Sequence, residues 1–208
     1  MRGRFLVIVV VIVVGVVLAG ILGSGILSPS IVSQPSTMVT SVVFITSASA
    51  VTQSSVGLVL TSAVFRDGGR IPSTYTCDGI GISPPLAWSG TPNGTKSIAL
   101  IVDDPDAPRG IFTHWVIFNI PATDNSLQEN ASATGNMPTG ATQGSNSGGR
   151  IGYTSPCPPS GTHHYLFHLY ALDMQLTIRA GATKQDLLTA IAGHILAEAQ
   201  LTGLYSRS

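Results

Sequence analysis

Four stretches of the chain show the spacing of apolar residues that is typical of β-strands. Residues 58–65 begin with alternating apolar positions, and residues 97–102, 114–120 and 165–172 are nearly continuous apolar runs of strand length. Turn-forming Pro, Gly and Asn residues separate these stretches. The pattern predicts a mostly β protein that folds as an antiparallel β-sandwich.

One amphipathic helix is predicted late in the chain. Thr183 and Asp186 have the spacing of a capping box, with Asp in place of the usual Glu. Apolar residues then recur at helical spacing, at Leu187, Leu188, Ile191, Ile195 and Leu196. Gly203 is placed to end such a helix. The sequence therefore predicts a sandwich with a C-terminal amphipathic helix.

The N-terminal part of the chain has a different pattern. Residues 5–22 are apolar or Gly throughout and follow Arg2 and Arg4. This length reaches a transmembrane span of about 17–25 residues, whereas the core of a signal peptide is about 7–15 residues. We expect an N-terminal transmembrane helix that holds a single-pass protein in the cell membrane, with the domain outside the cytoplasm. A signal segment that is cleaved to release a secreted protein is the alternative.

These patterns divide the chain into four parts. Residues 1–4 would be a cytoplasmic tip, and residues 5–23 the transmembrane anchor or signal segment. Residues 24–56 are rich in Ser and Thr and carry no charge, so we interpret them as a linker. Residues 57–208 would then form a single folded domain.

The charge of the chain excludes one class of function. The formal net charge is zero, and only 10% of the residues are charged, compared with about 25% in an average soluble domain. There is no basic surface of the kind that nucleic-acid binding requires. We therefore expect no nucleic-acid partner, and no long-range charge steering of other partners.

Titratable side chains gather beside rigid prolines in the middle of the domain. Residues 103–108 (DDPDAP) follow a predicted buried strand, so the prolines hold these carboxylates in a fixed loop. His114 opens the next strand. An Asp-Pro pair alone would favour a solvated acidic turn, and a lone histidine is more often a hydrogen-bonded core residue than a ligand.

A third cluster, residues 153–165 (YTSPCPPSGTHHY), combines a proline-rich loop with the start of a strand. Strand alternation places His163 and Tyr165 on one face and His164 on the other. Two donors on one face, next to a loop that exposes backbone N–H groups, suit an anion such as phosphate.

Several motifs together resemble the phosphatidylethanolamine-binding protein family, in particular its bacterial and archaeal branch of Raf-kinase-inhibitor-like proteins. The resemblance covers residues 57–206 and is specific, because the motifs occur in the same order and at compatible spacing. They are YTCDG (75–79), SPPL (83–86), DPDAP (104–108), GY (152–153), PCPP (156–159) and His163-x-Tyr165.

The resemblance implies a β-sandwich with a pocket at one end that binds phosphate-type anions or phospholipid head groups. The residues that match the ligand-binding positions are Asp104, His114, Pro156, Cys157, His163 and Tyr165. Those that match the pocket scaffold are Asp106, Pro108 and Ser155. In this assignment His163 and Tyr165 donate to phosphate oxygens, and Asp104 accepts from the ammonium of an ethanolamine head group.

The chain departs from the family pattern at three places. His164 stands where the family usually has Arg, so we expect a structural pairing to be lost there, away from the pocket. Ser155 replaces a Gly, which narrows the approach to the pocket but adds a hydroxyl donor. Residues 146–149 lack the Asp-Phe that is often present, so the conformation of that loop is open.

Cys77 and Cys157 are the only cysteines. In an exported domain an even count favours a disulfide, and two buried free thiols are the alternative. A metal site built from Asp104, His114, His163 and Cys157 is disfavoured, because these residues lack the close spacing of metal ligands. We expect no metal and no cofactor.

Two other classes of function remain as alternatives. A hydrolase would use Cys157 or Ser155 with His163, but the sequence has no nucleophile-elbow motif, so we do not expect an enzyme. Some members of the resembled family inhibit serine proteases or kinases. For a domain outside the cell, a serine protease is the more suitable protein partner, and protease inhibition is the second hypothesis.

Overall fold

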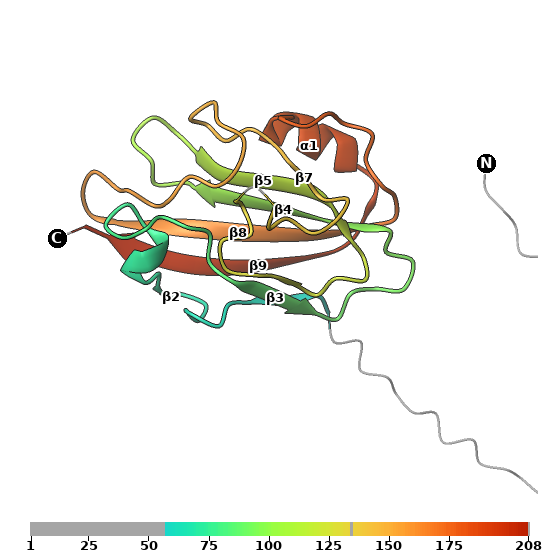
Figure 1. Ribbon diagram of the computed structural model, residues 1–208, viewed down its shortest axis with the longest axis horizontal. Coiled ribbons are helices and arrows are strands. Elements are labelled where there is room, and N and C mark those ends of the chain that lie inside the picture. The colour runs from blue at the N-terminus through green and yellow to red at the C-terminus, as the bar shows by residue number, and fades with distance from the viewer. Residues whose placement is uncertain (1–56, 134, 208) are drawn as a thin grey trace, which may run out of the picture. The chain divides into compact units, whose positions relative to one another are not determined.

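The computed structural model describes residues 57–133 and 135–207, which form two β-sheets and one α-helix (Figure 1). The small sheet consists of β1 (Val59–Thr61), β3 (Leu86–Ser89) and β6 (Ser126–Leu127), in the order β1-β3-β6. The large sheet contains β2 (Gly69–Arg70), β9 (Ile195–Ser206), β8 (Thr162–Leu172), β4 (Ser97–Asp104), β5 (Phe112–Pro121) and β7 (Thr142–Gln143), in that order across the sheet. A short 3-10 helix, η1 (Ser73–Tyr75), follows β2, and α1 (Lys184–Ile191) lies between β8 and β9.

The two faces of the large sheet bury two separate groups of apolar side chains. One face packs against the small sheet, around Trp115, Phe167 and Leu86. The other face packs against α1, where Val116 and Phe118 of the sheet join Leu187 and Ile191 of the helix in one cluster. Figure 1 shows α1 over the β4–β5–β7 side of the sheet.

The mostly β fold that the sequence predicts is confirmed. Each of the four expected strands is present, as β1, β4, β5 and β8. β4 and β5 are longer than expected and extend to Asp104 and Phe112, so the first part of the acidic loop belongs to a strand. All strand pairs are antiparallel except β2–β9, which is parallel.

The expected C-terminal helix is wrong in its second half. The capping box at Thr183 and Asp186 is present, but the helix ends at Ile191 and the chain turns at Gly193, which has φ 83°. The rest of the chain forms β9, which pairs with β8 along its whole length. Gly203 lies within this strand and does not end a helix.

Alternation in β9 explains this outcome. Leu201 and Tyr205 are buried, whereas Thr202 and Leu204 between them are only partly buried. Gly203 faces the core as well, and a Cβ atom there would lie 2.6 Å from the side chain of Ile71. The apolar spacing at the start of this segment fits a helix, but a strand paired with β8 buries its alternating face in the core.

The expected membrane span (5–23) and linker (24–56) lie outside the described part of the chain. Within residues 57–133 and 135–207, no helix has both the length and the apolar character needed to cross a membrane.

Candidate functional site

A cavity of about 210 Å³ lies at the end of the sandwich where β4 ends and β5 and β8 begin. In Figure 1 this is the end at which the chain's C-terminus emerges. Its lining residues come from the strand ends and from two loops: Asp104, Ala107, Pro108, Phe112, His114, Thr154, Ser155, Cys157, Pro158, Pro159 and His163. Four of the six expected ligand-binding residues are therefore brought together from distant parts of the sequence.

Asp104 and His163 form a buried pair at the wall of this cavity. Oδ2 of Asp104 lies 2.7 Å from Nδ1 of His163, and both side chains are less than 10% exposed. Oδ1 of Asp104 accepts a hydrogen bond of 2.9 Å from the backbone N–H of Asp106. Both carboxylate oxygens are thus engaged within the protein. Asp104 thus anchors the His163 ring, and its expected contact with a ligand's ammonium group stays a prediction.

His114 is held by the proline-rich loop. Its Nδ1 lies 2.7 Å from the carbonyl oxygen of Thr154, which accepts only, so Nδ1 carries the hydrogen. The backbone N–H of Thr154 in turn donates to the carbonyl of His114. Burial lowers the pKa of His114, although the bond to Thr154 partly opposes this. The lowered pKa favours the neutral imidazole, in which Nδ1 carries the hydrogen and Nε2 is unprotonated.

The Nε2 atoms of His114 and His163 are the groups that the cavity offers to a ligand. Within the described residues, neither atom has a hydrogen-bond partner, and neither is among the fully buried polar atoms that lack one. Since both rings line the cavity, these nitrogens are open to its contents. Two imidazole nitrogens with fixed orientations can bind one small polar group.

Two expected ligand-binding residues, Tyr165 and Pro156, do not line the cavity. Tyr165 is fully buried, and its ring meets that of His114 edge to face at a centroid distance of 5.2 Å. Its hydroxyl has no hydrogen-bond partner among the residues that the structure describes, and burial, followed by the charge of Asp104, raises its pKa. Pro156 is buried, and its carbonyl accepts from the backbone N–H of Cys77. In this structure both residues lie behind the residues that line the cavity and support them.

The scaffold residues divide in the same way. Pro108 and Ser155 line the cavity, whereas Asp106 points to the other side of β8. Oδ2 of Asp106 accepts from both the backbone N–H and Nδ1 of His164, each at 2.8 Å. The backbone hydrogen bond is the main reason that the pKa of Asp106 is lowered. The expected loss of pairing at His164 is wrong, because histidine makes this contact.

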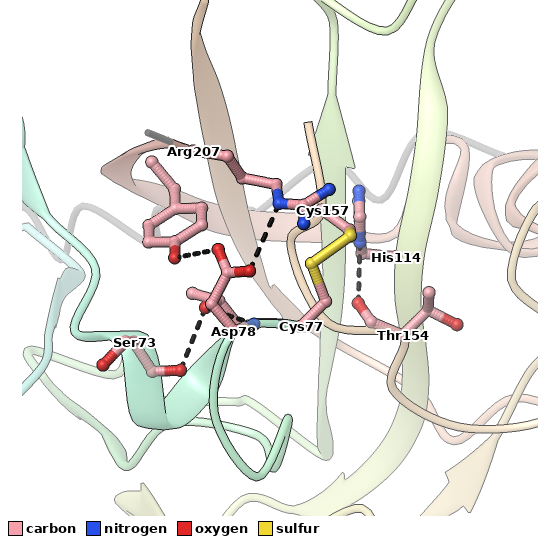
Figure 2. The surroundings of a disulfide bond; sticks show 9 residues. Ser73, Cys77, Asp78, His114, Thr154, Cys157 and Arg207 are labelled. Carbon is pink, nitrogen blue, oxygen red and sulfur yellow. Dashed lines mark hydrogen bonds and ion pairs between the residues drawn. A yellow bond between two sulfur atoms is a disulfide. The ribbon is translucent and has the colours of Figure 1, made fainter. Parts of the chain in front are cut away.

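A disulfide joins Cys77 to Cys157 beside the cavity (Figure 2). It ties the loop after η1 to the proline-rich loop, across 80 residues of sequence. In the chain-entropy view, closing a loop of this length stabilises the fold by about 4 kcal/mol. The neighbouring Asp78 accepts from Tyr205 and Arg207, which fixes the same loop to the end of β9.

The disulfide also bears on the alternatives to binding. Cys157 has no free thiol, so it can serve neither as a nucleophile nor as a thiolate metal ligand. In the part of the chain that the structure describes, no group of three or more His, Cys, Asp or Glu side chains is arranged to hold a metal ion.

Sequence analysis missed Phe112 and Thr154 as residues of the site. Phe112 lies two positions before His114 on β5, and its ring centroid is 4.8 Å from that of His114. Strand alternation extended by two residues would have found it. Ala107, Pro158 and Pro159 lie inside recognised motifs but were given no role. Thr154 acts through its backbone, for which the sequence holds no signal.

Asn146 is a second residue that only the structure reveals. It is buried, and its Nδ2 donates to the carbonyl of Gly152 and to the hydroxyl of Thr154. Its Oδ1 accepts from the backbone N–H groups of Gly148 and Arg150. One amide therefore organises the loop whose conformation the sequence left open, and this loop presents Thr154 to His114.

Comparison with known proteins agrees with this architecture. The family model for the phosphatidylethanolamine-binding protein matches residues 61–206. The chain belongs to this family. A relative named UPF0098 protein, from Methanothermobacter thermautotrophicus, is 57% identical over 148 residues, which are 71% of this chain and 98% of the relative.

Two solved structures of the phosphatidylethanolamine-binding protein (PEBP) family share the fold. CT736 from Chlamydia trachomatis, described as a PEBP homologue, has a TM-score of 0.68 and 43% identity. YbcL from E. coli, described as a member of the mammalian PEBP family, has a TM-score of 0.69 and 34% identity. Each match covers 73% of this chain and 99% of the other. The solved relatives therefore consist almost entirely of the matching domain, which folds without an N-terminal extension.

Proposed function

We propose that the domain binds phosphate-type anions, including the head groups of phospholipids, in the cavity formed by the ends of β4, β5 and β8. The observation that carries this proposal is the pair of fixed imidazoles, His114 and His163, whose Nε2 atoms are open to one small cavity. A volume of about 210 Å³ suits a phosphate group with a short substituent. It is below the roughly 300–1,000 Å³ of pockets for drug-sized ligands.

The charge of Asp104 imposes a condition on this ligand. A doubly charged phosphate beside a carboxylate is unfavourable unless a proton is shared in the site. If the phosphate keeps a proton, the unprotonated Nε2 of His114 can accept a hydrogen bond from its O–H group. For a monoester or inorganic phosphate, the bound species is therefore the singly charged form, whereas the phosphodiester of a phospholipid already carries a single charge and needs no shared proton.

This condition gives the proposal a pH dependence with a defined sign. A phosphate monoester has a second pKa near about 6, so its singly charged form becomes more abundant as the pH falls. For phosphoethanolamine we expect the affinity to rise about fivefold from pH 7 to pH 6. Binding that depended only on net attraction to the dianion would weaken over the same range.

The direct test is a titration of the isotopically labelled domain, residues 57–208, with inorganic phosphate and with phosphoethanolamine. We expect the NMR signals of the His114 and His163 rings to shift, and His163→Ala to abolish the binding. The matched control is His164→Ala, because its side chain is on the opposite face of β8 and is exposed. No shift in the native domain, or unchanged affinity in His163→Ala, would refute the proposal.

We further propose that this is a binding protein without turnover. Cys157 is oxidised, and Ser155 makes no hydrogen bond to a histidine among the described residues, so neither has an adjacent base to activate it. Hydrolysis of phosphoesters by the purified domain would contradict this.

The third part of the proposal concerns location. A disulfide persists in oxidising compartments, which supports a domain outside the cytoplasm. The apolar run at residues 5–22 supports an attachment to the membrane through the N-terminal segment. Fractionation of cells that express the full chain tests this: the protein should remain in the membrane fraction after a high-salt wash and be accessible to added protease. Release of the full-length protein by salt alone would argue against an anchor.

A further inference from the structure

The disulfide between Cys77 and Cys157 lies at the surface, although it joins two loops of the cavity end (Figure 2). Both cysteines are exposed, and Cys157 also lines the cavity. Residues 78–80, which follow Cys77 in its loop, are exposed as well. Thiol–disulfide exchange requires a thiolate to reach one of the two sulfurs, so exposed disulfides are reduced more easily than purely structural ones. This disulfide therefore has the surroundings of a reactive bond.

The first half of the proline-rich loop, residues 153–156, is held by hydrogen bonds. The hydroxyl of Tyr153 donates to the carbonyl of Tyr75. Thr154 exchanges two bonds with His114, one from its backbone N–H and one to its carbonyl. None of these bonds involves a sulfur atom. We therefore expect this half of the loop, and the orientation of His114, to be independent of the disulfide.

The second half of the loop, residues 157–161 (CPPSG), is held differently. It makes no backbone hydrogen bond within residues 57–133 and 135–207, and its two prolines have no N–H to donate. Pro158 and Pro159 line the cavity, and Pro158 is the one buried residue of this half. Apart from the packing of Pro158, the bond at Cys157 is therefore what fixes this wall of the cavity.

We propose that the Cys77–Cys157 disulfide is a thiol–disulfide exchange site, at which a dithiol reductant releases the second half of the loop and weakens binding in the cavity. The weakening rests on the proposed function, whereas the exchange does not. One thiolate of the reductant bonds to a cysteine sulfur, the S–S bond breaks, and the other cysteine leaves as a thiolate. The second thiolate of the reductant then attacks the mixed disulfide. Two electrons and two protons thus pass to the two cysteines, and the reductant becomes a disulfide.

The structure also favours correct re-formation of the bond. Cys77 and Cys157 are the only cysteines, so no other pairing within the chain competes. The backbone N–H of Cys77 donates to the carbonyl of Pro156 at 3.0 Å, and this bond keeps the two loops adjacent without the sulfurs. Asp78 fixes the Cys77 loop to the end of β9. We therefore expect the reduced domain to stay folded and to reoxidise to the same disulfide.

The first experiment compares the rate of reduction in the folded and the unfolded domain, residues 57–208. Dithiothreitol is added with or without urea, and free thiols are alkylated and counted by mass spectrometry at successive times. We expect the folded domain to be reduced at a rate within about tenfold of the unfolded one, because the sulfurs can be reached without unfolding. Reduction that requires urea, or that is about a thousandfold slower in the folded domain, would overturn the inference.

The second experiment measures the effect of reduction on the cavity. Phosphoethanolamine is titrated into the oxidised domain and into the domain kept reduced by dithiothreitol. We expect the affinity to fall about five- to tenfold on reduction, because the ligand must then order one wall of the cavity itself. Cys77→Ser breaks the bond but leaves Cys157 in place, and it should match the reduced domain. The matched control is Asp78→Asn, which weakens the other attachment of the Cys77 loop and keeps the disulfide; its affinity should stay within about twofold.

NMR relaxation separates the exchange site from the proposed function. The order parameters of Cys157, Ser160 and Gly161 should fall on reduction, while that of Thr154 stays unchanged. If the folded domain is reduced rapidly and these residues are released, but phosphoethanolamine binds neither form, the exchange site stands and the proposed ligand falls. Equal affinity of the two forms, or unchanged order parameters after reduction, would overturn the inference that the disulfide controls the cavity.

Discussion

At the cavity end of the large sheet, neighbouring residues have different bonding partners because their side chains lie on opposite faces. Asp103 and Asp104 are adjacent on β4, as are His163 and His164 on β8, and within each pair the side chains point to opposite faces. On the cavity face, Asp104 bonds to His163. On the other face, Asp103 accepts from Thr113 and forms an ion pair with Lys184 of α1.

The difference lies in what covers each face. α1 closes the far face and supplies Asp103 with a lysine, a partner that keeps its charge at all ordinary pH values. Among the described residues no α-helix covers the cavity, which is bordered by loops, and the partner of Asp104 is a histidine with one nitrogen still open to that space. Two equally buried carboxylates therefore act differently: Asp103 stabilises the fold, and Asp104 positions a binding group.

The largest effect that tests this comparison is on ligand affinity. We expect Asp104→Asn to weaken phosphoethanolamine binding about tenfold, because the His163 ring loses its charged anchor, whereas Asp103→Asn should change it less than about twofold. Both variants should lose about 1–2 kcal/mol of unfolding free energy, since each replaces a charged acceptor by a neutral one. Calorimetric titration and urea denaturation measure the two quantities.

The same two variants could also contradict the comparison of the two faces. Equal loss of affinity in Asp103→Asn and Asp104→Asn would show that the two faces are not separate. In that case the effect on binding would reflect general loosening of β4 and not the position of His163.

The next effect is on the pH dependence of stability. Burial lowers the pKa of His114, so below its ordinary value of about 6.5 the unfolded chain takes up a proton that the folded protein does not. The unfolding free energy should therefore fall as the pH is lowered from 7.5 to 5, by at most about 1.4 kcal/mol per pH unit for this group. His114→Gln, whose amide can still donate to Thr154, should have a shallower slope in denaturation experiments.

His168 provides the corresponding test on the far face. Its pKa is also lowered, mainly by burial, but it is only half-buried. His168→Gln should therefore reduce the slope less than His114→Gln does. The reverse order would show that the far face, and not the cavity, holds the more strongly desolvated histidine.

The smallest effect is expected at His164. Its pair with Asp106 is exposed on both sides, and such surface pairs contribute about 0–1 kcal/mol. The backbone N–H of His164 keeps its bond to Asp106 when the side chain is removed. We expect His164→Ala to lower the unfolding free energy by less than about 0.5 kcal/mol. A larger loss, measured by urea denaturation, would mean that the side chain holds the acidic loop in place.

Much of the site could be predicted because strands sort their residues by alternation. The alternation of β8 gave the correct faces for His163, His164 and Tyr165, and the family motifs led to Asp104 and His114. Two features could not be predicted in this way. Tyr165 shares a face with His163 but lies deeper, beneath His114, and alternation does not specify depth. Asn146 acts through four hydrogen bonds within one loop, and no sequence pattern predicts these bonds.

The sequence by itself determined the family, the mostly β fold, the four principal strands and the start of α1. These depend on local periodicity and on motifs that are contiguous in the chain. The tertiary structure decided that residues 195–206 form β9 and not a longer helix, since β8 offers a partner along their whole length. It also decided that Asp104 faces His163 while Asp103 faces Lys184. Such partners come from distant parts of the sequence, and only packing brings them within reach.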